Sequence, residues 1–318
     1  MRMIVAGLTL ALALGEGQAA TPARPPITGV SHLAVYGADP KASEHFYVDQ
    51  LGATEMPDPE NPAGARYHFN ADQYVEVLPL PAGQTGVNRL AHAAFMTSDA
   101  ERLRLYLKAK GVAVPAVVTQ GSDGSRWFDV KDPEGTPIQF VQPGPNTHAI
   151  TPDTLSSRII HVGFIIHNEA RENAFWQGIL GFRPYWKGGF DAQKPQWISM
   201  KVPDGQDWLE YMVVGTPEGT GIPRGMSQAD LGVLDHFALG VRDMRQTYTT
   251  LWNGKRLDGQ KPDALPKIGL DAKWQLNLLD PDGTRAEFME FTPIGTPCCS
   301  PFTAEHVDAP PAASKQSR

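Results

Sequence analysis

Four histidines recur along the chain, and each is followed, after a similar interval, by one polar residue inside an apolar run. The pairs are His32 with Glu76, His92 with Gln139, His161 with Glu210, and His236 with Glu287. The intervals are 44, 47, 49 and 51 residues. A carboxylate among apolar residues is costly to bury unless another group neutralises it. Converging histidines and glutamates could therefore hold a divalent cation, and imidazole with carboxylate suits Zn²⁺, Ni²⁺, Fe²⁺ or Mn²⁺.

The two halves of the chain differ in the ligands that they offer. The second set consists of His161, Glu210, His236 and Glu287, and the first set of His32, Glu76, His92 and Gln139. The second set brings two negative charges to a doubly charged ion, whereas the first brings one charge and a neutral amide. We therefore expect one divalent metal per chain at the second set and keep the first set as a candidate for a second metal. The alternative is that each histidine is a core residue with a backbone hydrogen bond.

The segments that must position these residues are themselves repeated. "DPEGTPIQF" covers residues 132–140 and "DPDGTRAEF" covers residues 280–288, with Gln139 and Glu287 at the eighth position. Four apolar runs open with histidine: "HLAVYGAD" at His32, "HAAFMTSD" at His92, "HVGFIIHN" at His161 and "HFALGVRD" at His236. A repeat of this kind predicts repeated structural units.

Each opening run is followed by a helical pattern and then by short strand-like runs. Asp99 and Asp243 precede two of the helical stretches and are expected to be their N-caps. Leu-Gly pairs at Gly52 and Gly181 end the other two, with glycine as the C-cap. Short runs rich in Val, Phe and Tyr then indicate strands. The sequence thus predicts an α+β fold of four β-α-β-β-β modules.

The length of 318 residues suits about two domains. We expect them at residues 27–143 and 156–293, each containing two modules. Residues 1–20 resemble a secretory signal peptide, with Arg2, an apolar run and small residues at Ala19 and Ala20. The protein is therefore expected to be exported, to the periplasm or beyond the cell. Residues 294–318 are expected to form a disordered tail.

The composition excludes some classes of partner. The formal net charge is −7 and no basic block occurs, so nucleic acid is not an expected partner. No apolar segment beyond the signal peptide is long enough to cross a membrane. The two cysteines, Cys298 and Cys299, are too few for a cysteine-type zinc site, and adjacent cysteines pair only through a strained ring. A monomer and a homodimer both remain open.

The repeated segments resemble the vicinal oxygen chelate superfamily, which includes glyoxalase I, fosfomycin and bleomycin resistance proteins and extradiol dioxygenases. The resemblance covers roughly residues 27–293 and rests on "HLAVYGADPKASEHFYVDQLGA", "HVGFIIHNEARENAFWQGILGF" and the two DP turns. It implies that paired modules close into cup-shaped mixed sheets, forming two glyoxalase-like domains. It also implies that first and last strands of modules supply the ligands of one metal. Glutamine serves as a ligand in some glyoxalases, so Gln139 is compatible with a metal.

The resemblance implies three alternative functions. The first is a lyase or isomerase of the glyoxalase type, similar to lactoylglutathione lyase, that acts on a small oxygenated substrate through a metal-bound enediolate. Glu287 and Glu210 would then be the catalytic residues, moving a proton between adjacent carbons. An exported protein would meet little glutathione, and no cluster of Arg and Lys indicates a glutathione site. This first alternative is the one that we favour.

The second alternative is an extradiol-type Fe²⁺ dioxygenase that uses His161, His236 and Glu287. The family signature places tyrosine three residues before the DP turn, where this chain has Asn277. The histidine that the signature expects further upstream is also missing from "KIGLDAKW". The acid-base and substrate-orienting groups of such an enzyme are therefore lacking.

The third alternative is a periplasmic protein that binds a small molecule without chemistry. Four aromatic residues on or near strands of the second half could line an apolar pocket: Trp197, Trp208, Tyr211 and Trp274. Such aromatic residues more often belong to a core.

Overall fold

The computed structural model describes residues 22–84, 89–145, 150, 155–214, 235–262 and 264–310. The expected signal peptide, residues 1–20, lies outside the described residues. None of the helices in the described part is long and apolar enough to span a bilayer.

The first sheet has eight strands in the order β2-β3-β4-β1-β5-β8-β7-β6. They are β1 (Ile27–Gly37), β2 (Thr54–Pro57), β3 (Ala65–His68), β4 (Tyr74–Pro79), β5 (Leu90–Thr97), β6 (Thr119–Gln120), β7 (Arg126–Lys131) and β8 (Pro137–Gln142). β1 runs parallel to β4 and antiparallel to β5. The first strands of the two modules therefore join them into one sheet.

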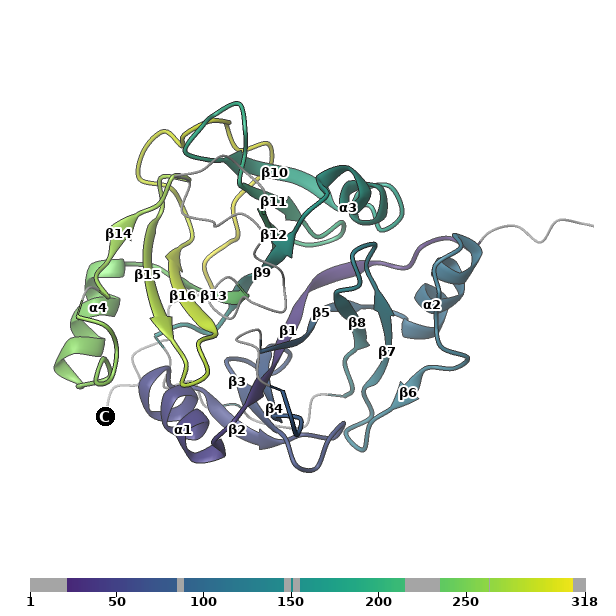
Figure 1. The fold of residues 1–318 in the computed structure, drawn as a ribbon, viewed down its shortest axis with the longest axis horizontal. Coiled ribbons are helices and arrows are strands. Elements are labelled where there is room, and N and C mark those ends of the chain that lie inside the picture. Colours follow the sequence, from purple (N-terminus) through teal and green to yellow (C-terminus); the bar gives the residue numbers. More distant parts are fainter. Residues whose placement is uncertain are drawn as a thin grey trace, which may run out of the picture.

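The second sheet repeats this topology in the order β10-β11-β12-β9-β13-β16-β15-β14. Its strands are β9 (Ile159–Ile166), β10 (Arg183–Gly188), β11 (Trp197–Lys201), β12 (Trp208–Val213), β13 (His236–Val241), β14 (Lys267–Ile268), β15 (Trp274–Leu279) and β16 (Arg285–Glu290). Figure 1 shows the two curved sheets side by side. All strands fall inside the expected domain limits 27–143 and 156–293, which themselves stay predictions.

One helical segment follows the first strand of each module, which confirms the predicted fold of four β-α-β-β-β modules. These segments are α1 (Pro40–Glu44) with the π-helical turn His45–Gln50, α2 (Ala100–Ala109), α3 (Glu169–Trp176) and α4 (Met244–Asn253). Asp99 and Asp243 accept hydrogen bonds from backbone N–H groups in the first turns of α2 and α4, as predicted. Gly52 and Gly181 adopt φ values of 80° and 82°, the left-handed conformation expected after a helix.

Alternate residues of the central strands face opposite sides of each sheet. One side carries the repeated histidines and forms a concave surface, which we call the first cup in residues 27–142 and the second cup in residues 159–290. The other side carries apolar residues such as Leu33, Val162 and Phe237, which belong to one core cluster shared by both halves. The shared core holds the backs of both sheets in place.

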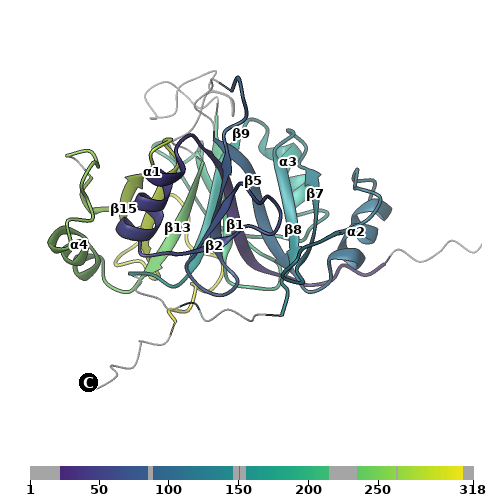
Figure 2. The same ribbon diagram turned by 90° about the horizontal axis from the view of Figure 1, so that it is seen from below.

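The repeated DP turns connect the two halves. Tyr47, next to α1, donates a hydrogen bond of 2.9 Å to Asp280 in the turn of the fourth module. The backbone N–H of His167, just before α3, donates to Glu134 in the turn of the second module. Figure 2 likewise shows α1 beside β15 and α3 beside β7 and β8. Each half therefore contributes a helix to the packing of the other.

The segment 298–308 packs along the second half. The N–H of Cys298 donates to the carbonyl of Leu270 at 2.7 Å, and the indole N–H of Trp186 donates to the carbonyl of Cys298 at 3.2 Å. Val307 is buried in the same apolar cluster as Trp186. The expectation of a disordered tail therefore does not hold for residues 294–310, because their polar and apolar groups find partners on the second sheet. Residues 311–318 lie outside the described residues.

Cys298 and Cys299 are joined by a disulfide bond between adjacent residues. The Cys299 Sγ atom lies 3.2 Å from the carbonyl oxygen of Gly189, at the end of β10. The pair thus belongs to the contact between the tail and the second sheet.

Candidate functional site

The second cup brings its two histidines together at the centre of the sheet. His161 on β9 and His236 on β13 are fully buried, and their Nε2 atoms lie 2.9 Å apart. In the antiparallel register His236 lies opposite Gly163. A Cβ atom at Gly163 would come within 2.1 Å of the His236 ring, so this position requires glycine. The absence of a side chain at residue 163 lets the two imidazoles meet.

The two glutamates come from the strands on either side, β12 and β16. Glu287 Oε2 lies 3.5 Å from His161 Nε2 and 3.9 Å from His236 Nε2. Glu210 Oε2 lies 3.5 Å from His236 Nε2. His161, His236 and Glu287 each offer a ligand atom within 4.8 Å of the others, whereas Glu210 approaches only His236. The four residues expected from the sequence thus converge, with Glu210 as the outer member.

Both carboxylates of the second cup favour the ionised form. Burial alone would raise the pKa of Glu287, but its hydrogen bond with His161 and the charge of Arg285 outweigh burial and hold this pKa at about 2. The pKa of Glu210 is also lowered, against burial, by its hydrogen bond with His236 and the nearby imidazoles. Ser199 Oγ donates to Glu210 Oε1 at 3.1 Å.

These donors fit a divalent ion. Two nitrogens that each lie about 2 Å from one ion are about 3 Å apart, which agrees with the separation of the two Nε2 atoms. Burial lowers the pKa of His236, so its imidazole favours the neutral form that binds metals. Among the described residues neither of these buried carboxylates forms an ion pair with a lysine or arginine, so a bound cation would neutralise their charge.

A cavity of about 280 Å³ opens beside the ligand residues of the second cup, and Glu210 and Glu287 line it. One wall is aromatic and consists of Trp186, Phe190 and Trp197. The other wall, from β15 and β16, carries the polar side chains of Gln275, Asn277 and Arg285. The ligand cluster therefore faces a space suited to a small molecule with an apolar part.

The expected aromatic lining is correct for one residue of four. Trp197 lines the cavity. Trp208 instead packs against the ring of His161, with centroids 4.7 Å apart. Tyr211 is buried in the shared core, and Trp274 packs against that core. Trp186 and Phe190, which do line the cavity, were missed because no regular spacing links them to the ligands.

The first cup repeats part of this arrangement. His32 and His92 approach with Nε2 atoms 2.8 Å apart, and Glu76 Oε2 lies 3.7 Å from His92 Nε2. These three residues offer ligand atoms within 4.8 Å of one another. The side-chain nitrogen of Gln139, however, donates to Glu60 and Asp129 at 2.9 and 3.2 Å. An amide between carboxylates must present its N–H₂ group to them, and the Oε1 atom of Gln139 is buried without a hydrogen-bond partner among the described residues.

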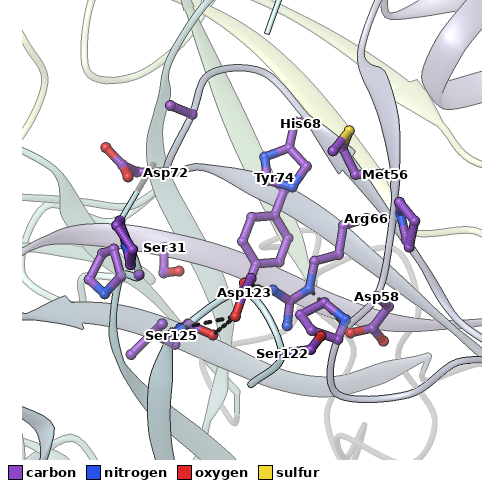
Figure 3. A pocket seen from close by; sticks show the side chains of 17 residues that line it. Ser31, Met56, Asp58, Arg66, His68, Asp72, Tyr74, Ser122, Asp123 and Ser125 are labelled. Carbon is purple, nitrogen blue, oxygen red and sulfur yellow. Dashed lines mark hydrogen bonds and ion pairs between the residues drawn. The ribbon is translucent and has the colours of Figure 1, made fainter. Parts of the chain in front are cut away.

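Arg66 supplies a positive charge to the first cup. Its guanidinium group forms ion pairs with Asp58 at 3.2 Å, Glu60 at 2.7 Å and Glu76 at 3.3 Å. It also lies over the Tyr74 ring, 4.5 Å from the centroid. Figure 3 shows Arg66 among Tyr74, Asp58 and Asp123 in a cavity of about 340 Å³.

The pKa of the first cup's glutamate shifts in the direction opposite to the pKa values of the second cup's glutamates. Burial raises the pKa of Glu76 well above its usual range, in spite of Arg66. Burial, reinforced by the charge of Arg66, lowers the pKa of His92 to about 3. The first cup thus disfavours additional charge, whereas the second stabilises two carboxylates. This contrast makes the second cup the better candidate for a metal.

Comparison with protein families and solved structures agrees with the fold. Residues 29–140 match the family described as the Glyoxalase/Bleomycin resistance protein/Dioxygenase superfamily. No curated protein sequence matches the chain.

Three solved structures illustrate the similarity. The 2,3-dioxygenase LapB from Pseudomonas sp. KL28 aligns with a TM-score of 0.62 and 15% identity, covering 84% of this chain and 93% of its own. A Mn(II)-bound glyoxalase from Novosphingobium aromaticivorans gives 0.63 and 15%, covering 90% and 85%. Homoprotocatechuate 2,3-dioxygenase from Brevibacterium fuscum, in complex with 3,4-dihydroxyphenylacetate, gives 0.59 and 18%, covering 86% and 82%. At such identities the likeness concerns the fold alone.

Proposed function

Because residues 29–140 match the Glyoxalase/Bleomycin resistance protein/Dioxygenase superfamily and both halves share one topology, we propose that the chain is a metal-dependent enzyme of the vicinal oxygen chelate superfamily whose active site is the second cup. The reaction that we propose is of the glyoxalase type, a lyase or isomerase reaction on a small oxygenated substrate. The proposed metal ligands are His161, Glu210, His236 and Glu287, and the metal is Zn, Ni, Fe or Mn. The further proposal of export rests on residues 1–20 alone and would be tested by the mass of the mature N-terminus.

The observation that carries this proposal is the presence of a second carboxylate beside the cavity. Glu287 lies near both imidazoles, whereas Glu210 lies beside His236 and accepts a hydrogen bond from Ser199. Glu287 is therefore suited to hold the ion, and Glu210 to exchange a proton with the substrate. Both carboxylates line the cavity.

A divalent ion at this site would polarise a substrate carbonyl and stabilise negative charge on its oxygen. Glu210, in its carboxylate form, would accept the proton of the hydroxyl-bearing carbon next to that carbonyl and return it to the carbonyl carbon, while the hydroxyl proton passes to the former carbonyl oxygen. The substrate then leaves as an isomer, and Glu210 regains its initial state. The aromatic wall would exclude water from the apolar part of the substrate.

An extradiol-type dioxygenase is the second candidate function. His161, His236 and Glu287 form a compact set of two histidines and one carboxylate, which suits Fe²⁺. Asn277 borders the cavity where the tyrosine of that signature is expected, and an amide is a poor acid or base. Oxygen uptake with catechols by the Fe²⁺-loaded protein would favour this candidate over the lyase.

Metal content per chain, measured by elemental mass spectrometry after purification without chelator, tests the proposed site. We expect one equivalent in the native protein. Glu287→Gln should lose both the metal and the activity. The loss of metal affinity should exceed the roughly 10–100-fold loss that follows removal of an outer-shell partner. Glu76→Gln is the matched control in the first cup and should retain one equivalent.

Three results would contradict the proposal in different ways. Full metal content and turnover in Glu287→Gln would show that the site is misplaced. An equal loss in Glu76→Gln would move the active site to the first cup. Failure to bind any of the four metals, together with no turnover of α-ketoaldehydes, their thiohemiacetals or catechols, would leave a protein that only binds small molecules.

A further inference from the structure

Arg285 is a cationic side chain on the polar wall of the second cavity. It lies on β16 two residues before Glu287, and alternate residues of a strand face the same side. Its Nε atom is buried and has no hydrogen-bond partner among the described residues. The first copy of the repeated turn has Pro137 at the equivalent position, so the first cup has no counterpart.

The carboxyl groups near Arg285 do not neutralise it. Glu287 is proposed to bind the metal, so its negative charge is shared with the ion. Asp235 is buried, but no ion pair joins it to Arg285 among the described residues. Neither Asp235 oxygen has a hydrogen-bond partner within the described part of the chain. Arg285 is half-buried, and a cation in this position favours an anion from outside the protein.

The charges around the cavity also favour an anionic ligand. The lining includes three carboxylates, Glu210, Asp271 and Glu287, and two cations, Lys267 and Arg285. This lining carries a net charge of −1 alone and +1 when a doubly charged metal is added. A cleft lined by charged residues focuses such a field on its ligand. The metal-loaded cavity therefore attracts a small anion.

The remaining walls indicate the shape of that anion. Phe190 and Trp197 meet edge to face, with centroids 5.5 Å apart, and present an apolar surface. On the opposite side Asn277 Oδ1 is buried without a partner among the described residues and lies across from Glu287 in the sheet register. An unpaired buried acceptor favours a ligand that brings a hydroxyl or N–H donor.

We propose that Arg285 determines specificity by binding an anionic group of the substrate, a carboxylate on a flat apolar body that also carries the oxygen atoms held at the metal. This inference rests on the proposed metal function. It adds the substrate class, namely small hydroxylated or keto acids with an aromatic or otherwise flat body.

Calorimetric titration of the metal-loaded full chain with three chelating probes tests the proposal. Acetohydroxamate has no ring, benzohydroxamate adds the ring, and carboxy-substituted benzohydroxamates (meta and para isomers) add the anion. We expect at least one carboxy isomer to bind more tightly than benzohydroxamate by about 10–100-fold, the value of a charge-assisted hydrogen bond. Arg285→Gln should abolish this advantage and leave the affinity for benzohydroxamate unchanged.

Arg245→Gln is the matched control, since it removes the same charge from the exposed face of α4. It should keep the full advantage of the carboxylate. Equal binding of carboxylated and plain benzohydroxamate by the native protein would overturn the proposal, and so would an advantage that survives in Arg285→Gln.

Failure of the metal proposal gives a different result. In that case hydroxamates would bind equally with and without metal. Titration with benzoate, which needs no chelation, would then test Arg285 separately. Binding lost in Arg285→Gln would support the anion site, and binding unchanged in that variant would overturn it.

Discussion

In the first cup, the guanidinium group of Arg66 contributes the positive charge that a metal would bring to the second. It is buried among the carboxyl groups of Asp58, Glu60 and Glu76, at ion-pair distances of 2.7–3.3 Å. A second cation next to this group would be repelled. Arg66, together with the neutral Gln139, therefore explains in physical terms why a chain with two similar cups would need only one metal.

We expect the double substitution Arg66→Met, Gln139→Glu to raise the metal content from one to two equivalents per chain. The change removes the competing cation and adds a second carboxylate beside His32, His92 and Glu76. Elemental mass spectrometry measures the content. Without metal, this variant should lose roughly 3–5 kcal/mol of stability, since buried carboxyl groups lose their partner, and added Zn²⁺ or Mn²⁺ should restore part of it.

Gln139→Glu alone is the matched control and should remain at one equivalent, because Arg66 still occupies the cup. A folded double variant that takes up no additional metal would show that Arg66 does not block the site.

At the scale of elements, the helices α1 and α3 hold the two halves together, because each contacts a DP turn of the other half. Glu172 of α3 is fully buried, and it accepts a hydrogen bond from Trp176 Nε1 at 3.0 Å. Burial, followed by the charge of Asp132 in the turn of the second module, raises the pKa of Glu172 to about 8. The contact between α3 and the first half is therefore sensitive to pH.

The sign of the effect follows from the raised pKa. Between about pH 4.5 and pH 8 the folded protein keeps the Glu172 proton while the unfolded chain releases it, so this group's contribution to stability falls as pH rises. Glu172→Gln has no proton to lose and should resemble the native protein at pH 5. At pH 8 it should be more stable, by roughly 4 kcal/mol.

Urea denaturation of both proteins at pH 5 and pH 8 measures the difference. Glu169→Gln, a change at a half-buried position of the same helix, should show no such dependence on pH. A constant difference between Glu172→Gln and the native protein at both pH values would refute the role of this proton.

The elements were largely predictable, because they depend on local patterns and on the internal repeat. The four modules, the N-caps Asp99 and Asp243 and the convergence of His161 with His236 all follow from spacings that occur more than once. Arg66 was not predictable in this way, since its partners lie in separate segments that only the folded sheet brings together. Arg285 did leave a signal, because it stands where the first copy of the repeated turn has Pro137.

At the scale of the whole molecule, one core cluster joins the backs of the two sheets. We therefore expect both halves to unfold together in one calorimetric transition. Metal bound at the second cup should raise the stability of the entire chain, by about 2.7 kcal/mol when its concentration is 100 times the dissociation constant.

Hydrogen exchange with and without chelator tests this coupling. Chelation should increase exchange in β1 and β5 of the first half as well as in β9 and β13. Two separate transitions, only one of them sensitive to the metal, would show that the halves are independent. In that case the contacts of α1 and α3 would add little to the stability of either.

The segment 298–308 has a consequence for the order of events during synthesis. Every strand of the second sheet leaves the ribosome before the segment that covers Trp186 and Leu270, two residues that line the cavity. Domains generally fold as units while the chain is still being made. The second cup can therefore form before the segment 298–308 is available. Its aromatic wall is then covered only when this last part of the chain arrives.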